Sequence, residues 1–160
     1  MGRKQIDVVV ESPAEAGAIY DLLVDGASWP RWSKFDSFEL ERPGEGGGDG
    51  SLGAVRVFRL GRRITSREEL VELVPGRRYS YSYLSGLPIV DYRADVDLTP
   101  SPDETGGTGG TTIHWHSSFR PKFVGTGWLY RLVLQRFIRD TASRVAAYAA
   151  PVSAGPAPSR

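Results

Sequence analysis

The stretch TTIHWHSSFRPKFVGTGWLYRLVLQRFIRDTASRVAAYA (residues 111–149) decides the fold. Its first nine residues, 111–119, place apolar residues at alternate positions from Ile113 onward, which predicts a strand. Residues 121–127 break this pattern with proline and glycine. From Trp128 to Ala149 apolar residues recur at helical spacing, which predicts a helix about 30 Å long. A helix of that length beside a strand must lie across a sheet.

One face of this helix is predicted to pack on the sheet, and it comprises Tyr130, Leu134, Phe137, Ile138, Thr141, Val145 and Tyr148. The opposite face is predicted to be solvated, and it comprises Arg131, Gln135, Arg136, Arg139 and Ser143. Contact of the basic face with an acidic partner or with lipid headgroups is the alternative.

The N-terminal part predicts a strand over residues 6–10 and then a helix. Ser12 and Glu15 have the spacing of a capping box, which predicts that the helix begins directly after Ser12 and runs to Val24. A second, short helical turn is predicted at residues 29–32. Five further strands are predicted between turns rich in glycine and proline, at residues 36–40, 54–60, 64–74, 78–83 and 92–98.

The order of these elements predicts an α+β fold. A curved antiparallel sheet of about seven strands wraps around the long C-terminal helix, and one or two short helices follow the first strand. We expect one domain over residues 1–150 and a disordered tail over residues 151–160, which is rich in proline and small residues.

The composition excludes several classes of protein. Of the 160 residues, 40% are hydrophobic and 24% charged, which is ordinary for a globular domain. A net charge of +1 provides no field that would attract nucleic acid. The absence of cysteine removes disulfides and thiolate chemistry. No run reaches the length of a signal peptide or a membrane span, so we expect a cytoplasmic protein, monomeric or homodimeric, without stable membrane insertion.

The chain resembles the START-like, helix-grip superfamily of the SRPBCC type, which includes polyketide cyclases/dehydrases and lipid-binding proteins. The resemblance covers residues 4–150 and rests on the order and spacing of five segments: Ser12–Glu15, Trp29–Trp32, Val74–Arg78, Thr111–Trp115 and Phe119–Lys122. It implies a pocket for a hydrophobic ligand between the sheet and the C-terminal helix.

Two functions are consistent with that pocket. The first is binding of a small hydrophobic or aromatic molecule, for carriage, sensing or sequestration, with no cofactor. The second is an enzyme of the cyclase, aromatase or dehydratase type, in which a tyrosine or an inward arginine donates a proton or stabilises an oxyanion. A carboxylate or arginine beside a tyrosine in the cavity would favour the enzyme, and a collapsed interior would favour an interaction domain. No residue is assigned a catalytic role.

Alternation along three strands, together with the helix stripe, indicates which side chains face inward. The predicted ligand-binding residues are Tyr81, Tyr83, Tyr92, Ala94, Val96, Trp115, Ser117, Phe119, Leu134 and Ile138. A ligand site of this make-up would enclose about 300 Å³ or more. The alternative is that the same residues fill a closed core.

Five further polar residues are candidates for a functional site: His114, His116, Arg56, Arg67 and Glu69. His114 and His116, the only histidines, alternate with inward residues, so we expect them on the outer face and predict no metal site. The strands that carry Arg56, Arg67 and Glu69 have apolar residues on both faces, so their patterns do not show whether these side chains point inward or outward. We expect all three at the surface, because a buried charge needs a partner.

Overall fold

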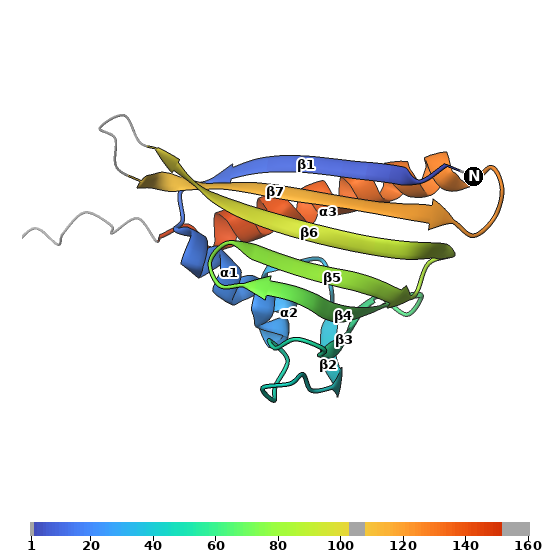
Figure 1. Ribbon diagram of the computed structural model, residues 1–160, viewed down its shortest axis with the longest axis horizontal. Coiled ribbons are helices and arrows are strands. Elements are labelled where there is room, and N and C mark those ends of the chain that lie inside the picture. Colours follow the sequence, from blue (N-terminus) through green and yellow to red (C-terminus); the bar gives the residue numbers. More distant parts are fainter. Residues whose placement is uncertain (1, 103–107, 152–160) are drawn as a thin grey trace, which may run out of the picture.

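A computed structural model describes residues 2–102 and 108–151. Its single sheet has seven antiparallel strands in the order β1-β7-β6-β5-β4-β3-β2 (Figure 1). The strands are β1 (Lys4–Ser12), β2 (Ser37–Arg42), β3 (Val55–Leu60), β4 (Ile64–Val74), β5 (Arg78–Ser85), β6 (Ile89–Pro102) and β7 (Thr108–Pro121).

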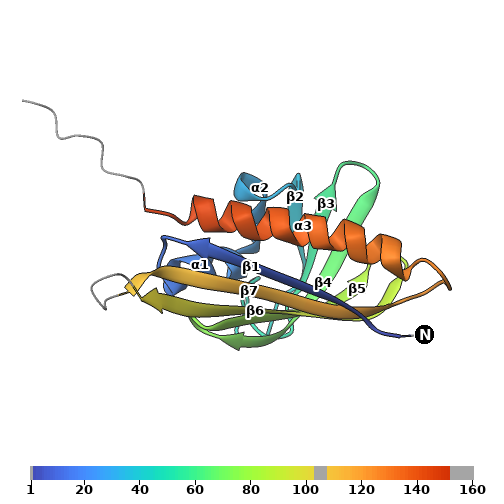
Figure 2. The ribbon, with the colours of Figure 1, turned by 90° about the horizontal axis from the view of Figure 1, so that it is seen from above.

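The helices all lie on the concave side of the sheet. They are α1 (Ala16–Val24), the 3₁₀ turn η1 (Gly26–Ser28), α2 (Trp29–Trp32) and α3 (Gly127–Tyr148). Figure 2 shows α3 running along β1 and β7, with α1 and α2 on the same side. This arrangement confirms the predicted α+β, helix-grip fold.

Rows of inward side chains run across the strands and form the floor of the core. Tyr79 lies opposite Val96, which lies opposite Trp115, which in turn lies opposite Val8. All four side chains are buried, so the alternation in β5, β6 and β7 places their apolar residues toward α3 as predicted.

Most of the buried residues of helix α3 lie in its C-terminal half, and Gly127 at its first position is also buried. Ile138, Thr141, Ala142, Val145 and Ala146 are buried. Tyr148, predicted to face the sheet, is 48% exposed, because Ala146 and Ala149 are the residues of the last turn that pack against the core. In the N-terminal half the exposed apolar side chains are Trp128, Leu129, Leu132 and Val133.

The predicted capping box is wrong. Ser12 is the last residue of β1, and α1 begins at Ala16 after Glu15, whose side chain makes no capping hydrogen bond. The Ser12 hydroxyl instead donates to the Ala146 carbonyl of α3 at 2.7 Å and accepts from the Ala14 amide. The Ser12 hydroxyl therefore makes a tertiary contact in place of the helix cap that the local pattern predicted.

None of the helices in the described ranges is long and apolar enough to cross a membrane. The predicted tail lies outside the described residues, except for Pro151.

Candidate functional site

A small cavity lies between the sheet and α3, with a volume of about 50 Å³. Its walls are Trp29, Phe35, Ser66, Glu68, Tyr81, Tyr83, Ile89, Tyr92, Trp115, Leu134, Phe137, Ile138 and Thr141. The cavity is far smaller than the expected 300 Å³ because aromatic rings occupy the interior. Trp29 packs 4.9 Å from Phe58, and Phe35 packs 5.3 Å from Phe137, between ring centroids.

The structure brings six of the ten predicted site residues to this cavity: Tyr81, Tyr83, Tyr92, Trp115, Leu134 and Ile138. The other four, Ala94, Val96, Ser117 and Phe119, are buried in the sheet but do not line the cavity. Prediction from strand alternation identified the inward face, whereas the cavity occupies only one part of that face.

Sequence reasoning missed Glu68 and Ser66, which line the cavity from β4. Both are buried, and so is Leu70 on the same face of the strand. The pattern Ser66-x-Glu68-x-Leu70 was the available signal, because alternate residues share a face. The neighbouring charges at Arg67 and Glu69 obscured it.

Glu68 is the one carboxyl group among the cavity residues. Its Oε2 accepts a hydrogen bond from the Ser66 hydroxyl at 3.0 Å, whereas its buried Oε1 has no partner among the residues that the structure describes. Burial raises the pKa of Glu68 to about 7, although Arg56 and the Ser66 hydrogen bond oppose that increase. The group therefore changes its charge near neutral pH.

Arg56 is fully buried, which contradicts the expected surface position. Its Nη1 donates to the carbonyls of Leu23 and Val24 at the end of α1, 3.1 Å from each, and its Nη2 donates to the Tyr79 hydroxyl. The last carbonyls of a helix lack partners within the helix and carry partial negative charge, so they accept a guanidinium well.

The tyrosines of the cavity remain protonated at physiological pH. Burial raises the pKa of Tyr92 to about 12 and that of Tyr81 well above its ordinary value. Their hydroxyl oxygens lie 3.4 Å apart. The hydroxyl of Tyr83 is buried near the Leu87 backbone without hydrogen-bonding geometry to it.

Trp115 contributes the third polar atom of the cavity wall that lacks a partner among the described residues, after Glu68 Oε1 and the Tyr83 hydroxyl. Its indole Nε1 is buried and makes no hydrogen bond. By contrast, Trp29 Nε1 donates to the Leu23 carbonyl at 3.1 Å. The cavity thus combines aromatic walls with an unpaired acceptor, Glu68 Oε1, and an unpaired donor, Trp115 Nε1.

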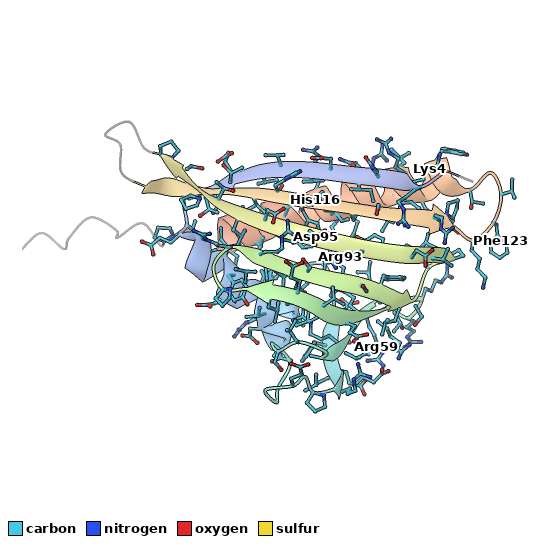
Figure 3. The ribbon with its side chains drawn as sticks, viewed as in Figure 1. Lys4, Arg59, Arg93, Asp95, His116 and Phe123 are labelled. Atoms are coloured by element: carbon cyan, nitrogen blue, oxygen red, sulfur yellow. The ribbon has the colours of Figure 1, made fainter. Side chains whose placement is uncertain are left out.

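The histidines lie on the outer face of the sheet, as predicted, and Figure 3 shows His116 there near Asp95 and Arg93. His114 pairs with Asp7 at 3.0 Å and His116 with Asp97 at 2.7 Å. The two histidines and Asp97 could bring ligand atoms within 4.8 Å of one another. Asp97, however, already accepts two hydrogen bonds from a neighbouring arginine, Arg78.

Arg67 and Glu69, whose facing was open, point away from the cavity. Arg67 donates two hydrogen bonds to the Glu41 carboxylate, and Glu69 pairs with Arg42 at 3.3 Å. These pairs link β2 to β4 across the outer face of β3.

The seven-stranded sheet and the long helix α3 define a protein of the START-like, helix-grip fold class. The family described as polyketide cyclase/dehydrase and lipid transport matches residues 3–150, and the chain belongs to this family. None of the curated proteins matches the sequence.

Solved structures share the fold at low sequence identity. A START superfamily protein from Mycobacterium smegmatis has a TM-score of 0.74 and 12% identity, covering 92% of this chain and 97% of its own. The protein XoxI from Bacillus cereus has a TM-score of 0.71 and 18% identity, with 92% and 95% covered. Norcoclaurine synthase from Thalictrum flavum, in complex with dopamine and hydroxybenzaldehyde, has a TM-score of 0.69 and 14% identity, with 92% and 86% covered.

Proposed function

We propose that this protein binds a small hydrophobic or aromatic molecule in the cavity between the sheet and α3, as a cytoplasmic carrier, sensor or sequestering protein. The observation that carries the proposal is that three buried polar atoms in an aromatic wall lack partners among the described residues: Glu68 Oε1, Trp115 Nε1 and the Tyr83 hydroxyl. Buried polar atoms are normally paired, and a ligand or water can supply the missing partners.

The fold supports the same proposal. The chain belongs to a family described by cyclase, dehydrase and lipid-transport activities. A protein of the same fold, norcoclaurine synthase, has been solved with two small aromatic molecules. Small aromatic compounds are therefore the first ligands to consider.

The 50 Å³ cavity is too small for such a ligand without movement of its walls. Tyr83, Leu134 and Phe137 are wall residues that are only half-buried. Leu134 and Phe137 belong to the N-terminal and middle part of α3, where the helix is least covered. We propose that a ligand enters by displacing these side chains.

Thermal unfolding with a panel of ligands tests the proposal. The panel runs from benzene-sized phenols and hydrocarbons to fatty acids and sterols. A ligand at a hundredfold excess over its Kd stabilises the folded state by about 2.7 kcal/mol, which should raise Tm by about 5–10 °C. Trp115→Ala should move the preference toward larger ligands, whereas Trp128→Ala, at an exposed position, should not.

No shift with any member of the panel would reject ligand binding. An interaction domain with a closed core would then be the better account of the small cavity.

A second candidate, an enzyme of the cyclase, aromatase or dehydratase type, is favoured by one observation. The Glu68 carboxyl lines the cavity together with Tyr81 and Tyr92, and its raised pKa suits proton transfer near neutral pH. Arg56 is not among the wall residues, so it is not the inward arginine of this hypothesis. Conversion of a bound panel member by the wild type but not by Glu68→Gln would support the enzyme.

A further inference from the structure

Glu68 is buried at a position where a carboxyl group costs stability. It is 4% exposed, and only one of its two oxygens has a protein partner. An apolar residue of similar size would avoid the cost of burying an unpaired polar atom. Ser66 could not satisfy both oxygens, because a single hydroxyl donates one hydrogen. Oε1 is therefore a buried acceptor without a partner among the described residues, on a side chain that lines the cavity.

Arg56 compensates the charge of Glu68 without occupying this oxygen. The two residues are direct partners in the register of β3 and β4. The guanidinium makes its hydrogen bonds to Leu23, Val24 and Tyr79 instead. Together the ionised pair is neutral, so a ligand of either charge would bury a net charge in the cavity.

The hydrogen-bonding groups of the cavity wall further restrict the chemical class of the ligand. An ionised Glu68 accepts hydrogen bonds, whereas a protonated Glu68 donates one. A hydroxyl group can both donate and accept, so it pairs with Glu68 in either state. A hydrocarbon leaves Oε1 unpaired. The rings of Trp29, Phe35 and Tyr92 offer aromatic surface for a flat ligand.

We infer that the cavity selects a neutral phenol, whose ring lies among the aromatic walls and whose hydroxyl bonds to Glu68 Oε1. This inference rests on the proposed function of ligand binding in the cavity. It names the class of ligand and assigns Glu68 as the residue that distinguishes a phenol from a hydrocarbon, a carboxylate or an amine of the same size.

Ligand-observed ¹⁹F NMR titration with four matched probes tests the inference. The probes are 4-fluorophenol, fluorobenzene, 4-fluorobenzoate and 4-fluorobenzylamine, at about pH 8, where an ordinary phenol of pKa about 10 is still neutral. We expect 4-fluorophenol to bind the wild type at least about tenfold more tightly than each of the other three, since a hydrogen bond to a charged group contributes about that factor.

Variants at Glu68 measure the contribution of this residue to ligand preference separately from that of the other cavity residues. In Glu68→Leu the preference for 4-fluorophenol over fluorobenzene should fall to about twofold or less. Glu68→Gln should keep part of the preference, because its amide can still accept and donate, and it guards against misfolding of the leucine variant. Glu69→Gln, on the outer face of the same strand, is the matched control and should retain the wild-type preference.

Three results would overturn the inference in distinguishable ways. Equal affinity for 4-fluorophenol and fluorobenzene, or tighter binding of the benzoate or benzylamine, would leave ligand binding intact and reject the phenol. An undiminished preference in both Glu68 variants would reject the role of Glu68. Absence of binding by all four probes to the wild type would reject the proposed site together with the inference.

Discussion

At the residue scale, the two buried charges Arg56 and Glu68 distinguish this core from a simple hydrophobic one. The two side chains differ in how their polar atoms are hydrogen-bonded. The terminal nitrogens of Arg56 donate to the carbonyls of Leu23 and Val24 and to the Tyr79 hydroxyl, although its Nε has no partner among the described residues. Glu68, by contrast, has one hydrogen-bonded oxygen and one oxygen without such a partner. The first arrangement stabilises the fold, and the second leaves a polar atom for a ligand at the expense of stability.

The raised pKa of Glu68 predicts an unusual dependence of stability on pH. The folded protein holds this proton up to about pH 7, and the unfolded chain releases it near 4.5, so the contribution is present at low pH and lost as the pH rises through 7. Glu68→Gln has no such loss. Relative to Glu68→Gln, the wild type should lose about 2–3 kcal/mol of unfolding free energy between about pH 5 and pH 8.

Urea unfolding at both pH values measures this difference. Glu69→Gln, whose site lies on the outer face beside Arg42, provides the control for removing a carboxylate from β4. Parallel pH profiles for the wild type and Glu68→Gln would show that Glu68 ionises normally in the folded protein.

Arg56→Leu should destabilise the protein by about 3–5 kcal/mol, because it leaves the Glu68 charge uncompensated and the α1 carbonyls and the Tyr79 hydroxyl unpaired. Arg59→Leu, three residues further along β3, removes only a surface pair with Glu39 and should cost less than about 1 kcal/mol. Chemical unfolding near neutral pH measures the unfolding free energy of both variants. A similar loss of unfolding free energy in Arg56→Leu and Arg59→Leu would contradict the role of Arg56 as a buried, hydrogen-bonded charge.

At the element scale, the two halves of α3 contribute differently to the stability of the fold. Its C-terminal half is buried against the sheet, and its N-terminal half exposes apolar side chains. The wall residues Leu134 and Phe137 lie where these halves meet. We therefore expect the first half to move more easily, which agrees with its proposed place at the entrance.

The two valines of α3 give a matched test of this division. Val145 is fully buried, whereas Val133 is 49% exposed. Val145→Ala should cost about 2 kcal/mol of unfolding free energy through lost burial and a residual cavity. Val133→Ala should stay within about 0.5 kcal/mol. Equal costs for the two variants would mean that the helix is packed uniformly.

The same scale shows what the sequence could predict. Tyr79, Tyr81 and Trp115 alternate with polar residues, so the inward face of their strands followed from the local pattern. The position of Arg56 did not, because its partners lie at the end of α1, more than 30 residues away. The predicted role of Ser12 was wrong for the same reason, because its hydroxyl donates to the carbonyl of the distant Ala146. Contacts between distant segments decide which polar residues are buried, and local periodicity does not contain them.

At the scale of the whole molecule, a curved sheet closed by one long helix encloses a core that aromatic rings almost fill. The cavity that remains has aromatic walls and three polar atoms without partners among the described residues, and it lies between the sheet and α3, where the ligand site was predicted. Its small volume limits which ligands enter without rearrangement. The size of the cavity was not predictable, because it depends on how Trp29, Phe35 and Phe137 pack against one another.

The indole N–H signals of the four tryptophans provide the most direct test of ligand binding in this cavity. In a ¹H–¹⁵N NMR titration with 4-fluorophenol, the Trp115 signal should shift saturably, because Trp115 lines the cavity and its N–H has no partner among the described residues. Trp29, also in the wall, should shift with the same Kd, and Trp128, which is 66% exposed on α3, should not. Saturation at Trp128 alone, or no saturable shift at Trp115, would contradict binding between the sheet and α3.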